Sequence, residues 1–166
     1  MASAASRTVL VGHDGSGTAD LALAWALDYA ARCDARIRVI RGWSLATAPR
    51  PDSMTRRYVP PIEDFEAAVL ARLRADAAPV LAESGAGAEV DYEAYHGAAA
   101  NGMIEASRSA DLLVVGARGL GGFKGLALGS VSDQCVRHSG CPVVVVRDEH
   151  SAGIERTREL DRVVDG

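Results

Sequence analysis

The stretch LLVVGARGLGGFKGLALGS, residues 112–130, decides the fold class of this chain. Its first four residues are continuously apolar, which is typical of a parallel strand covered by helices on both faces. The glycines that follow predict a sharp turn at the carboxyl end of that strand, and Ser130 begins a short helical segment. A strand, a glycine-rich turn and a helix in this order form the repeating unit of an α/β protein.

Other apolar runs on either side of this stretch alternate with segments of helical length. The five predicted strands cover residues 8–11, 36–40, 89–95, 112–115 and 143–146. The last of them reads VVVV and is also continuously apolar. This alternation predicts a three-layer, doubly wound α/β domain built on a single parallel sheet.

Helical periodicity predicts four helices between the strands. Three of them cover about residues 18–32, 98–108 and 130–138. Another begins after Pro61, and Pro79 should end or kink it. Residues 44–59 contain Pro49 and Pro51, are followed by Pro60 and show no periodicity, which predicts a long loop and a candidate lid near a ligand.

Composition limits the function. The 166 residues are 48% hydrophobic and 24% charged, which fits one ordinary globular domain. The net charge is -4 and no Lys/Arg cluster is present, so we expect no nucleic-acid partner. The longest apolar run is far shorter than the roughly 20 residues of a spanning helix, and the N-terminus MASAASR has no hydrophobic signal core. We therefore expect a cytoplasmic protein without a membrane partner.

The cysteines and histidines show no spacing typical of metal or redox sites. Cys33, Cys135 and Cys141 contain no CxxC pair and fall in or beside predicted core elements, so we interpret them as small buried hydrophobes. The four histidines form no HExxH motif. No metal site built from protein side chains is expected.

The glycine-rich loop has the composition of a phosphate cradle. Gly116 and Gly119 lie where the chain leaves the strand and exposes backbone N–H groups, and a side chain there would block a ligand. Gly129 and Ser130 lie at the start of the next helix, whose free N–H groups and positive dipole end favour an anion. Ser130 has a second interpretation, because Ser130 and Asp133 match a helix capping box.

A second turn of small residues follows the first strand, in VGHDGSG at residues 11–17. Asp14 in this turn could accept hydrogen bonds from ribose hydroxyls, or it could stabilise only its own turn. In open parallel sheets, ligands bind at the carboxyl ends of the strands where the strand order reverses. Two such turns on neighbouring strand ends would line one crevice.

Other nucleotide motifs do not match. A Walker A motif needs GxxxxGK[ST], whereas Lys124 stands in GGFKG without a following hydroxyl. The turn VGHDGSG does not match the dinucleotide pattern GxGxxG, and residues 119–124 break that pattern at its last glycine. No GxSxG elbow, no HxGH-like nucleotidyl-transfer motif and no SGGxDS pyrophosphatase motif is present, so the catalytic groups of the common ATP-using α/β enzymes are missing.

The spacing Gly116-x2-Gly119-x9-Gly129-Ser130 resembles the ATP-binding signature of the universal stress protein family. The opening VLVGHDGS and the segment 110–147 are also similar to that family, and the resemblance extends over about residues 7–147. It implies a Rossmann-like, five-stranded parallel sheet in the order 3-2-1-4-5 that binds ATP, with or without Mg²⁺, across strands one and four. It also implies a homodimer paired through the last strand, with Cys141 and Arg147 at the ends of that strand.

The same resemblance implies a set of nucleotide-binding residues and no catalytic ones. Asp14 would contact the ribose or the adenine, and the backbone near Arg41 and Gly42 would face the adenine. His13 and the Arg41-Gly42 pair depart from the usual pattern of a small apolar residue and a His-Val pair, and a bulky His13 could stack on or crowd the adenine. The implied set comprises Gly12, His13, Asp14, Arg41, Gly42, Gly116, Arg118, Gly119, Gly129, Ser130, Val131 and Ser132.

The resulting hypothesis is an ATP-binding universal stress protein with a regulatory role in a stress response, read by an unknown partner protein. The domain would cover residues 7–147, between a flexible N-terminus at 1–6 and a C-terminal tail at 148–166. A slow Mg²⁺-dependent ATPase is one alternative, with Arg118 or Lys124 stabilising charge. A scaffolding module that binds no nucleotide is another.

Overall fold

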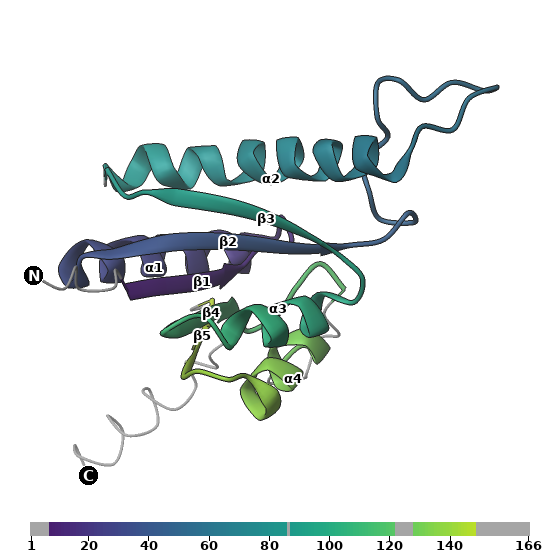
Figure 1. Cartoon of the computed structure of the whole chain (residues 1–166). Coiled ribbons are helices and arrows are strands. Elements are labelled where there is room, and N and C mark those ends of the chain that lie inside the picture. Colours follow the sequence, from purple (N-terminus) through teal and green to yellow (C-terminus); the bar gives the residue numbers. More distant parts are fainter. Residues whose placement is uncertain (1–6, 86, 122–127, 149–166) are drawn as a thin grey trace, which may run out of the picture.

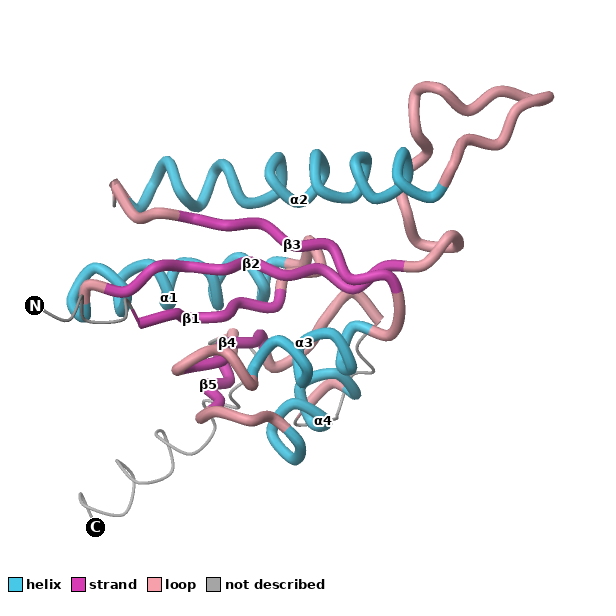
Figure 2. Tube along the Cα trace, viewed as in Figure 1, coloured by secondary structure: helices cyan, strands magenta, loops and turns pink. Residues whose placement is uncertain are grey.

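Five parallel strands form one sheet in the order β3-β2-β1-β4-β5 (Figures 1 and 2). They are described by a computed structural model that covers residues 7–85, 87–121 and 128–148. This arrangement confirms the predicted α/β fold and strand order. The strands are β1 (Arg7–Gly12), β2 (Ala35–Trp43), β3 (Val90–His96), β4 (Leu112–Gly116) and β5 (Val143–Val146).

Helices cover both faces of the sheet and complete three layers. They are α1 (Gly17–Cys33), α2 (Ile62–Ser84), α3 (Ala99–Ser107) and α4 (Ser130–His138). Alternate residues of β1 face opposite cores: Val9 and Val11 pack with α1 and α2, whereas Leu10 packs with residues of α3 and α4. Strand β1 is therefore buried on both sides, as is typical of a central strand in a parallel sheet.

The helix α1 begins at a side-chain cap and ends at a left-handed residue. The Ser16 hydroxyl accepts a hydrogen bond from the Ala19 amide, and Asp34 ends the helix with φ of 50°. Its buried face repeats at helical spacing through Ala19, Leu23 and Leu27, which lie against the sheet.

Pro79 was predicted to end or kink the second helix. It does not end it, because α2 continues through Pro79 to Ser84. Val80 and Leu81, beyond the proline, pack on the same core as Leu73 and Ala77. This burial holds the last turn in place although Pro79 donates no backbone hydrogen bond. The helix ends at Gly85, whose φ of 59° is readily adopted by glycine.

The strand order reverses between β1 and β4. From β1 the chain adds β2 and then β3 on one side of the sheet. It then returns through α3 and forms β4 on the other side of β1. The register pairs Val11 with Val114, so β1 and β4 end side by side. This reversal point is where open α/β sheets form a ligand crevice.

Candidate functional site

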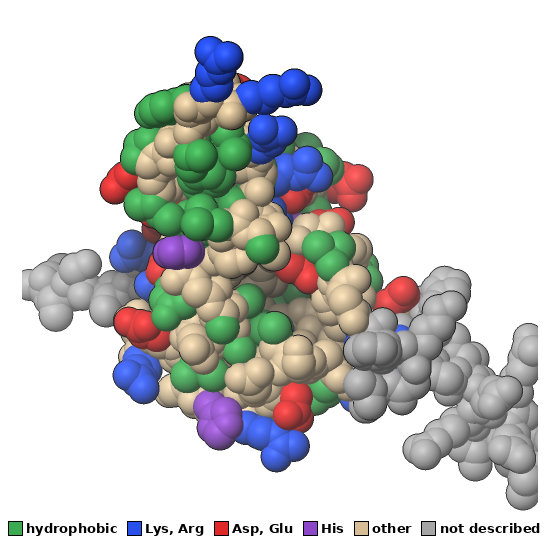
Figure 3. Space-filling view, turned by 90° about the vertical axis from the view of Figure 1, so that its right-hand side faces the viewer, with side chains coloured by type: hydrophobic (Ala, Val, Ile, Leu, Met, Phe, Trp, Pro, Cys, Tyr) green, Lys and Arg blue, Asp and Glu red, His purple; other side chains and the backbone are tan. Residues whose placement is uncertain are grey.

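A cavity of about 360 Å³ opens at the carboxyl ends of β1 and β4. Figure 3 views the molecule from this end of the sheet, where the surface is hollowed. The described residues that line the cavity are Gly12, Asp14, Ala19, Ala99, Met103, Val115, Gly116, Arg118, Gly119, Leu120, Gly121, Leu128, Gly129, Ser130, Val131 and Ser132. The structure thus brings together all the sequence-predicted site residues except His13, Arg41 and Gly42.

Packing within the protein accounts for glycine at the end of β4. A Cβ at Gly116 would lie 2.9 Å from the carbonyl carbon of Thr18, so Gly116 lets the start of α1 approach β4. A Cβ at Gly12 would lie 2.6 Å from the sulfur of Met103, a flexible side-chain end that can move. The sequence interpretation of Gly116 as a ligand-clearing glycine overlooked this contact with α1.

Gly129 differs, because nothing in the described structure requires glycine there. Its φ of -73° and ψ of 163° are open to any residue, and a Cβ would have its nearest neighbour, Arg118 Cα, at 3.5 Å. Its amide donates to the Ala117 carbonyl at 2.7 Å, which draws the start of α4 toward the turn after β4. A side chain here would project toward residues 117–119, across the space that the two turns share.

The start of α4 presents backbone N–H groups at the cavity. Gly129 is the N-cap residue and has no side-chain cap, while Ser130 is the first helical residue. The capping-box interpretation of Ser130 is therefore wrong. The first intrahelical bond runs from the Asp133 amide to the Gly129 carbonyl, so the amides of Ser130, Val131 and Ser132 precede it. Three successive amides at a positive helix end form an anion-binding geometry.

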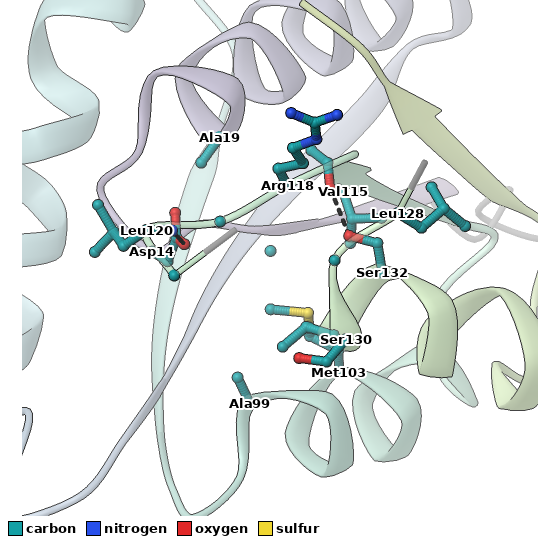
Figure 4. A pocket seen from close by; sticks show the side chains of 16 residues that line it. Asp14, Ala19, Ala99, Met103, Val115, Arg118, Leu120, Leu128, Ser130 and Ser132 are labelled. Atoms are coloured by element: carbon teal, nitrogen blue, oxygen red, sulfur yellow. Dashed lines mark hydrogen bonds between the residues drawn. The ribbon is translucent and has the colours of Figure 1, made fainter. Parts of the chain in front are cut away.

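Hydrogen bonds hold the turn after β4 to its neighbours. The Ser132 hydroxyl donates to the Gly116 carbonyl at 2.6 Å, drawn as a dashed line in Figure 4, and the Thr18 hydroxyl donates to the Arg118 carbonyl. Ser132 was predicted to lie near the phosphates, and its hydroxyl also fastens β4 to α4. The cavity wall is therefore tied to both α1 and α4.

Asp14 stabilises its own turn and also bonds the turn after β4, a contact that the sequence did not predict. One carboxylate oxygen accepts from the Ser16 amide at 2.9 Å, which closes an Asx turn, and the other accepts from the Leu120 amide at 3.0 Å across the cavity rim (Figure 4). Burial alone would raise the pKa of Asp14, but hydrogen bonds from Ser16 and Leu120 outweigh it and lower the pKa below its usual 3.8. A charged acceptor is thus fixed at the rim.

His13 lies outside the cavity lining and is fully buried. Its Nε2 is 3.0 Å from a carboxylate oxygen of Asp20, and its Nδ1 is 3.2 Å from Nη2 of Arg41. The expectation that His13 stacks on or crowds an adenine is therefore wrong. Its ring occupies a polar layer between β1, β2 and α1 instead.

Burial and the positive charge of Arg41 lower the pKa of His13 below its usual 6.5, although Asp20 opposes them. The folded protein thus favours the neutral ring, whereas the unfolded chain protonates it near its usual pKa. The stability that the neutral ring contributes is present above about pH 6.5 and falls as the pH drops below that value.

We therefore expect the free energy of unfolding to fall between about pH 7 and about pH 5, and His13→Gln to weaken that fall. Urea unfolding at the two pH values measures the free energy of unfolding of the wild type and of His13→Gln. His138→Gln, at an exposed position, is the control and should leave the fall unchanged. The contribution of Asp14 is lost only below its usual 3.8, outside this window. Equal pH dependence of the wild type and His13→Gln would contradict the assignment.

The apolar side of the cavity was not predicted from the sequence. Ala99 and Met103 of α3 form it together with Val115 and Val131 (Figure 4). Gly42, predicted to face adenine, instead makes room for this wall, since a Cβ there would lie 2.7 Å from Cβ of Ala99. The small residues of α3 were a usable signal, because they allow close approach to a strand end.

The predicted lid, residues 44–59, lies away from the cavity and supplies none of its described lining residues. Part of it packs on a separate cluster around Trp43 and Phe65. Lys124, the predicted flexible N-terminus and most of the predicted tail lie outside the described residues.

Within the described residues, no three His, Cys, Asp or Glu side chains are grouped so as to hold a metal ion. None of the helices there is both long and apolar enough to cross a bilayer. Cys33, Cys135 and Cys141 are free thiols, and burial raises the pKa of Cys135 to about 11.

A doubly wound sheet with a glycine-lined cavity at its reversal point defines a Rossmann-like α/β domain. The sequence model described as "Universal stress protein family" matches residues 5–147. The chain belongs to the universal stress protein family.

Individual relatives agree with this assignment. A universal stress protein of Thermus aquaticus is 35% identical over 146 residues, which cover 85% of this chain and 98% of the relative. Universal stress protein Rv2623 of Mycobacterium tuberculosis is 35% identical over 149 residues, 86% of this chain. The chain spans about half the length of such mycobacterial relatives, 48% in this case.

A solved universal stress protein in complex with cAMP has a TM-score of 0.62 and 26% identity to this chain. The comparison covers 86% of this chain and 97% of the solved one. The likeness thus extends over nearly the whole of both domains.

Proposed function

We propose that this chain binds one adenine nucleotide in the cavity between β1 and β4. The phosphates would lie on the turn after β4 and against the amides of Ser130 and Val131, at the positive end of α4. The base would lie on the apolar wall formed by Ala99 and Met103. The volume of about 360 Å³ falls within the range usual for small-molecule sites.

The main support for this proposal is the presence of glycine at position 129. Gly129 is a glycine without a backbone or packing reason in the described structure, at the point where an anion would approach the helix. The solved relative in complex with cAMP supports an adenine nucleotide as the ligand class. ATP is our proposed ligand, with or without Mg²⁺, because the spacing Gly116-x2-Gly119-x9-Gly129-Ser130 resembles the ATP-binding signature of the family.

We further propose that the bound nucleotide regulates rather than fuels the protein, in a stress response read by a partner protein. The chain would form a homodimer through β5, an edge strand whose Val143–Val146 are all only half-buried. Sedimentation velocity checks the dimer, and a monomer alone at every concentration would contradict it.

The proposal predicts that wild-type protein retains adenine nucleotide. Equilibrium dialysis with ATP, cAMP and GTP measures it, together with mass-spectrometric identification of any nucleotide that survives purification. We expect saturable binding of ATP at one site per chain and weaker binding of GTP. Absence of saturable binding of any adenine nucleotide would contradict the proposed function.

A further inference from the structure

A partly buried polar cluster lies behind the Asp14 turn, outside the described lining of the cavity. Its centre is Arg41 of β2, whose side chain is only 12% exposed. Nε of Arg41 donates to the His13 carbonyl at 2.8 Å, and Nη2 lies 2.9 Å from a carboxylate oxygen of Asp76 in α2. A single guanidinium thus joins the end of β1 to β2 and α2. We refer to His13, Asp20, Arg41 and Asp76 as the Arg41 cluster.

The Asp14 turn rests directly on this cluster. Gly15 has a φ of 90°, and a Cβ there would lie 3.1 Å from Asp76 Oδ2 and 3.5 Å from Arg41 Nη2. The Gly15 amide lies 3.3 Å from Nδ1 of His13. Asp14 is therefore flanked by His13, which belongs to the cluster, and by Gly15, which contacts it.

The hydrogen bonds of the cluster require a neutral His13. Nδ1 faces two donors, the Gly15 amide and Nη2 of Arg41, so it must be the acceptor. Nε2 then carries the proton and donates to Asp20. A protonated ring would direct an N–H group at both donors and break the contact with the turn.

We infer that His13, Arg41 and Asp76 are positioning residues that hold the Asp14 carboxylate at the cavity rim. This inference rests on the proposed nucleotide site and deepens it. His13 and Arg41 belong to the two places where the sequence departs from the usual pattern, and they contact each other outside the cavity lining. Nucleotide affinity is thereby coupled to α2, which contributes no described residue to the cavity lining.

Two variants, Arg41→Met and Asp76→Ala, test the inference by two measurements on the full chain. Dialysis with ATP should show the Kd raised about tenfold in each, because Asp14 is displaced. Carboxylate NMR titration without nucleotide should show the pKa of Asp14 raised, because the bonds from Ser16 and Leu120 weaken. Removing the negative charge of Asp76 would by itself lower that pKa, so a rise in Asp76→Ala reports displacement of the turn.

Matched controls separate positioning from general stability. Arg38→Met removes another partly buried arginine of β2, which bonds the end of α3 instead. Arg72→Ala removes the exposed second partner of Asp76 and leaves Arg41 in place. Both controls should keep the Kd within twofold and the pKa of Asp14 unchanged. If Arg41→Met does not fold, Arg41→Lys replaces it in both measurements. Lysine keeps the positive charge but lacks the planar set of N–H donors of the guanidinium.

The two measurements distinguish failure of the inference from failure of the proposed function. In Arg41→Met the loss of a positive charge would by itself raise that pKa, so the decision rests on Asp76→Ala. If the wild type binds ATP and the pKa of Asp14 does not rise in Asp76→Ala, the positioning role is refuted. If the wild type binds no adenine nucleotide, the proposed function fails, while the titration still decides whether the cluster positions Asp14.

Discussion

Gly129→Val should reduce the affinity for ATP by about a hundredfold, or roughly 2.8 kcal/mol, with the fold retained. The valine side chain would project toward residues 117–119 and occupy the approach to the amides of α4. The extended backbone at this position accepts valine, and the weaker N-cap should cost only about 1 kcal/mol of stability. Dialysis with ATP and urea unfolding of the same preparation measure both effects.

Gly17→Val is the matched control, because Gly17 is also at the start of a helix and a Cβ there meets no atom within 4 Å. It lies outside the described lining of the cavity, so the Kd should be unchanged. Gly129→Ala should fall between the wild type and Gly129→Val. If Gly129→Val binds ATP as the wild type does, the phosphates do not lie at α4.

Gly42→Ala should instead lower the free energy of unfolding, by about 1–3 kcal/mol, the range usual for overpacking. Its Cβ would lie 2.7 Å from Cβ and 2.8 Å from the backbone nitrogen of Ala99, so the end of β2 and the start of α3 must separate. Because Ala99 lines the cavity, nucleotide affinity should fall as well. Urea unfolding and dialysis on one preparation give both quantities.

Gly17→Ala serves as the reference for this second substitution, since it adds a methyl group in open space at a helix start and should be neutral or slightly stabilising. Unchanged unfolding of Gly42→Ala would show that α3 does not pack against β2 as closely as described. The two glycines should thus give different results. Substitution of Gly129 should mainly weaken ATP binding, whereas substitution of Gly42 should mainly lower the free energy of unfolding.

The fold could be predicted from the sequence because apolar runs and glycine turns are local signals. Continuously apolar strands such as β5 and the helix α4 were located to the residue. The prediction failed at Pro79, where Val80 and Leu81 anchor the final turn on the core. Tertiary packing outweighed a strong local signal there.

The candidate site could be predicted only in part. The glycine turns carry a recognisable spacing, so the glycine-lined side of the cavity was located from sequence. The apolar wall of Ala99 and Met103 has no such spacing, because its residues are also ordinary core types. The contact of Arg41 with His13 and Asp76 joins three separate elements, and only the folded chain brings them together.

The central claim is that an adenine nucleotide occupies this cavity with its phosphates at the start of α4. Titration of isotope-labelled protein with ATP, followed by amide and methyl NMR shifts, tests it most directly. We expect saturable shifts of the Gly119, Ser130 and Val131 amides and of the Met103 methyl group. Saturable shifts confined to residues away from the cavity, or no shifts at all, would contradict the claim.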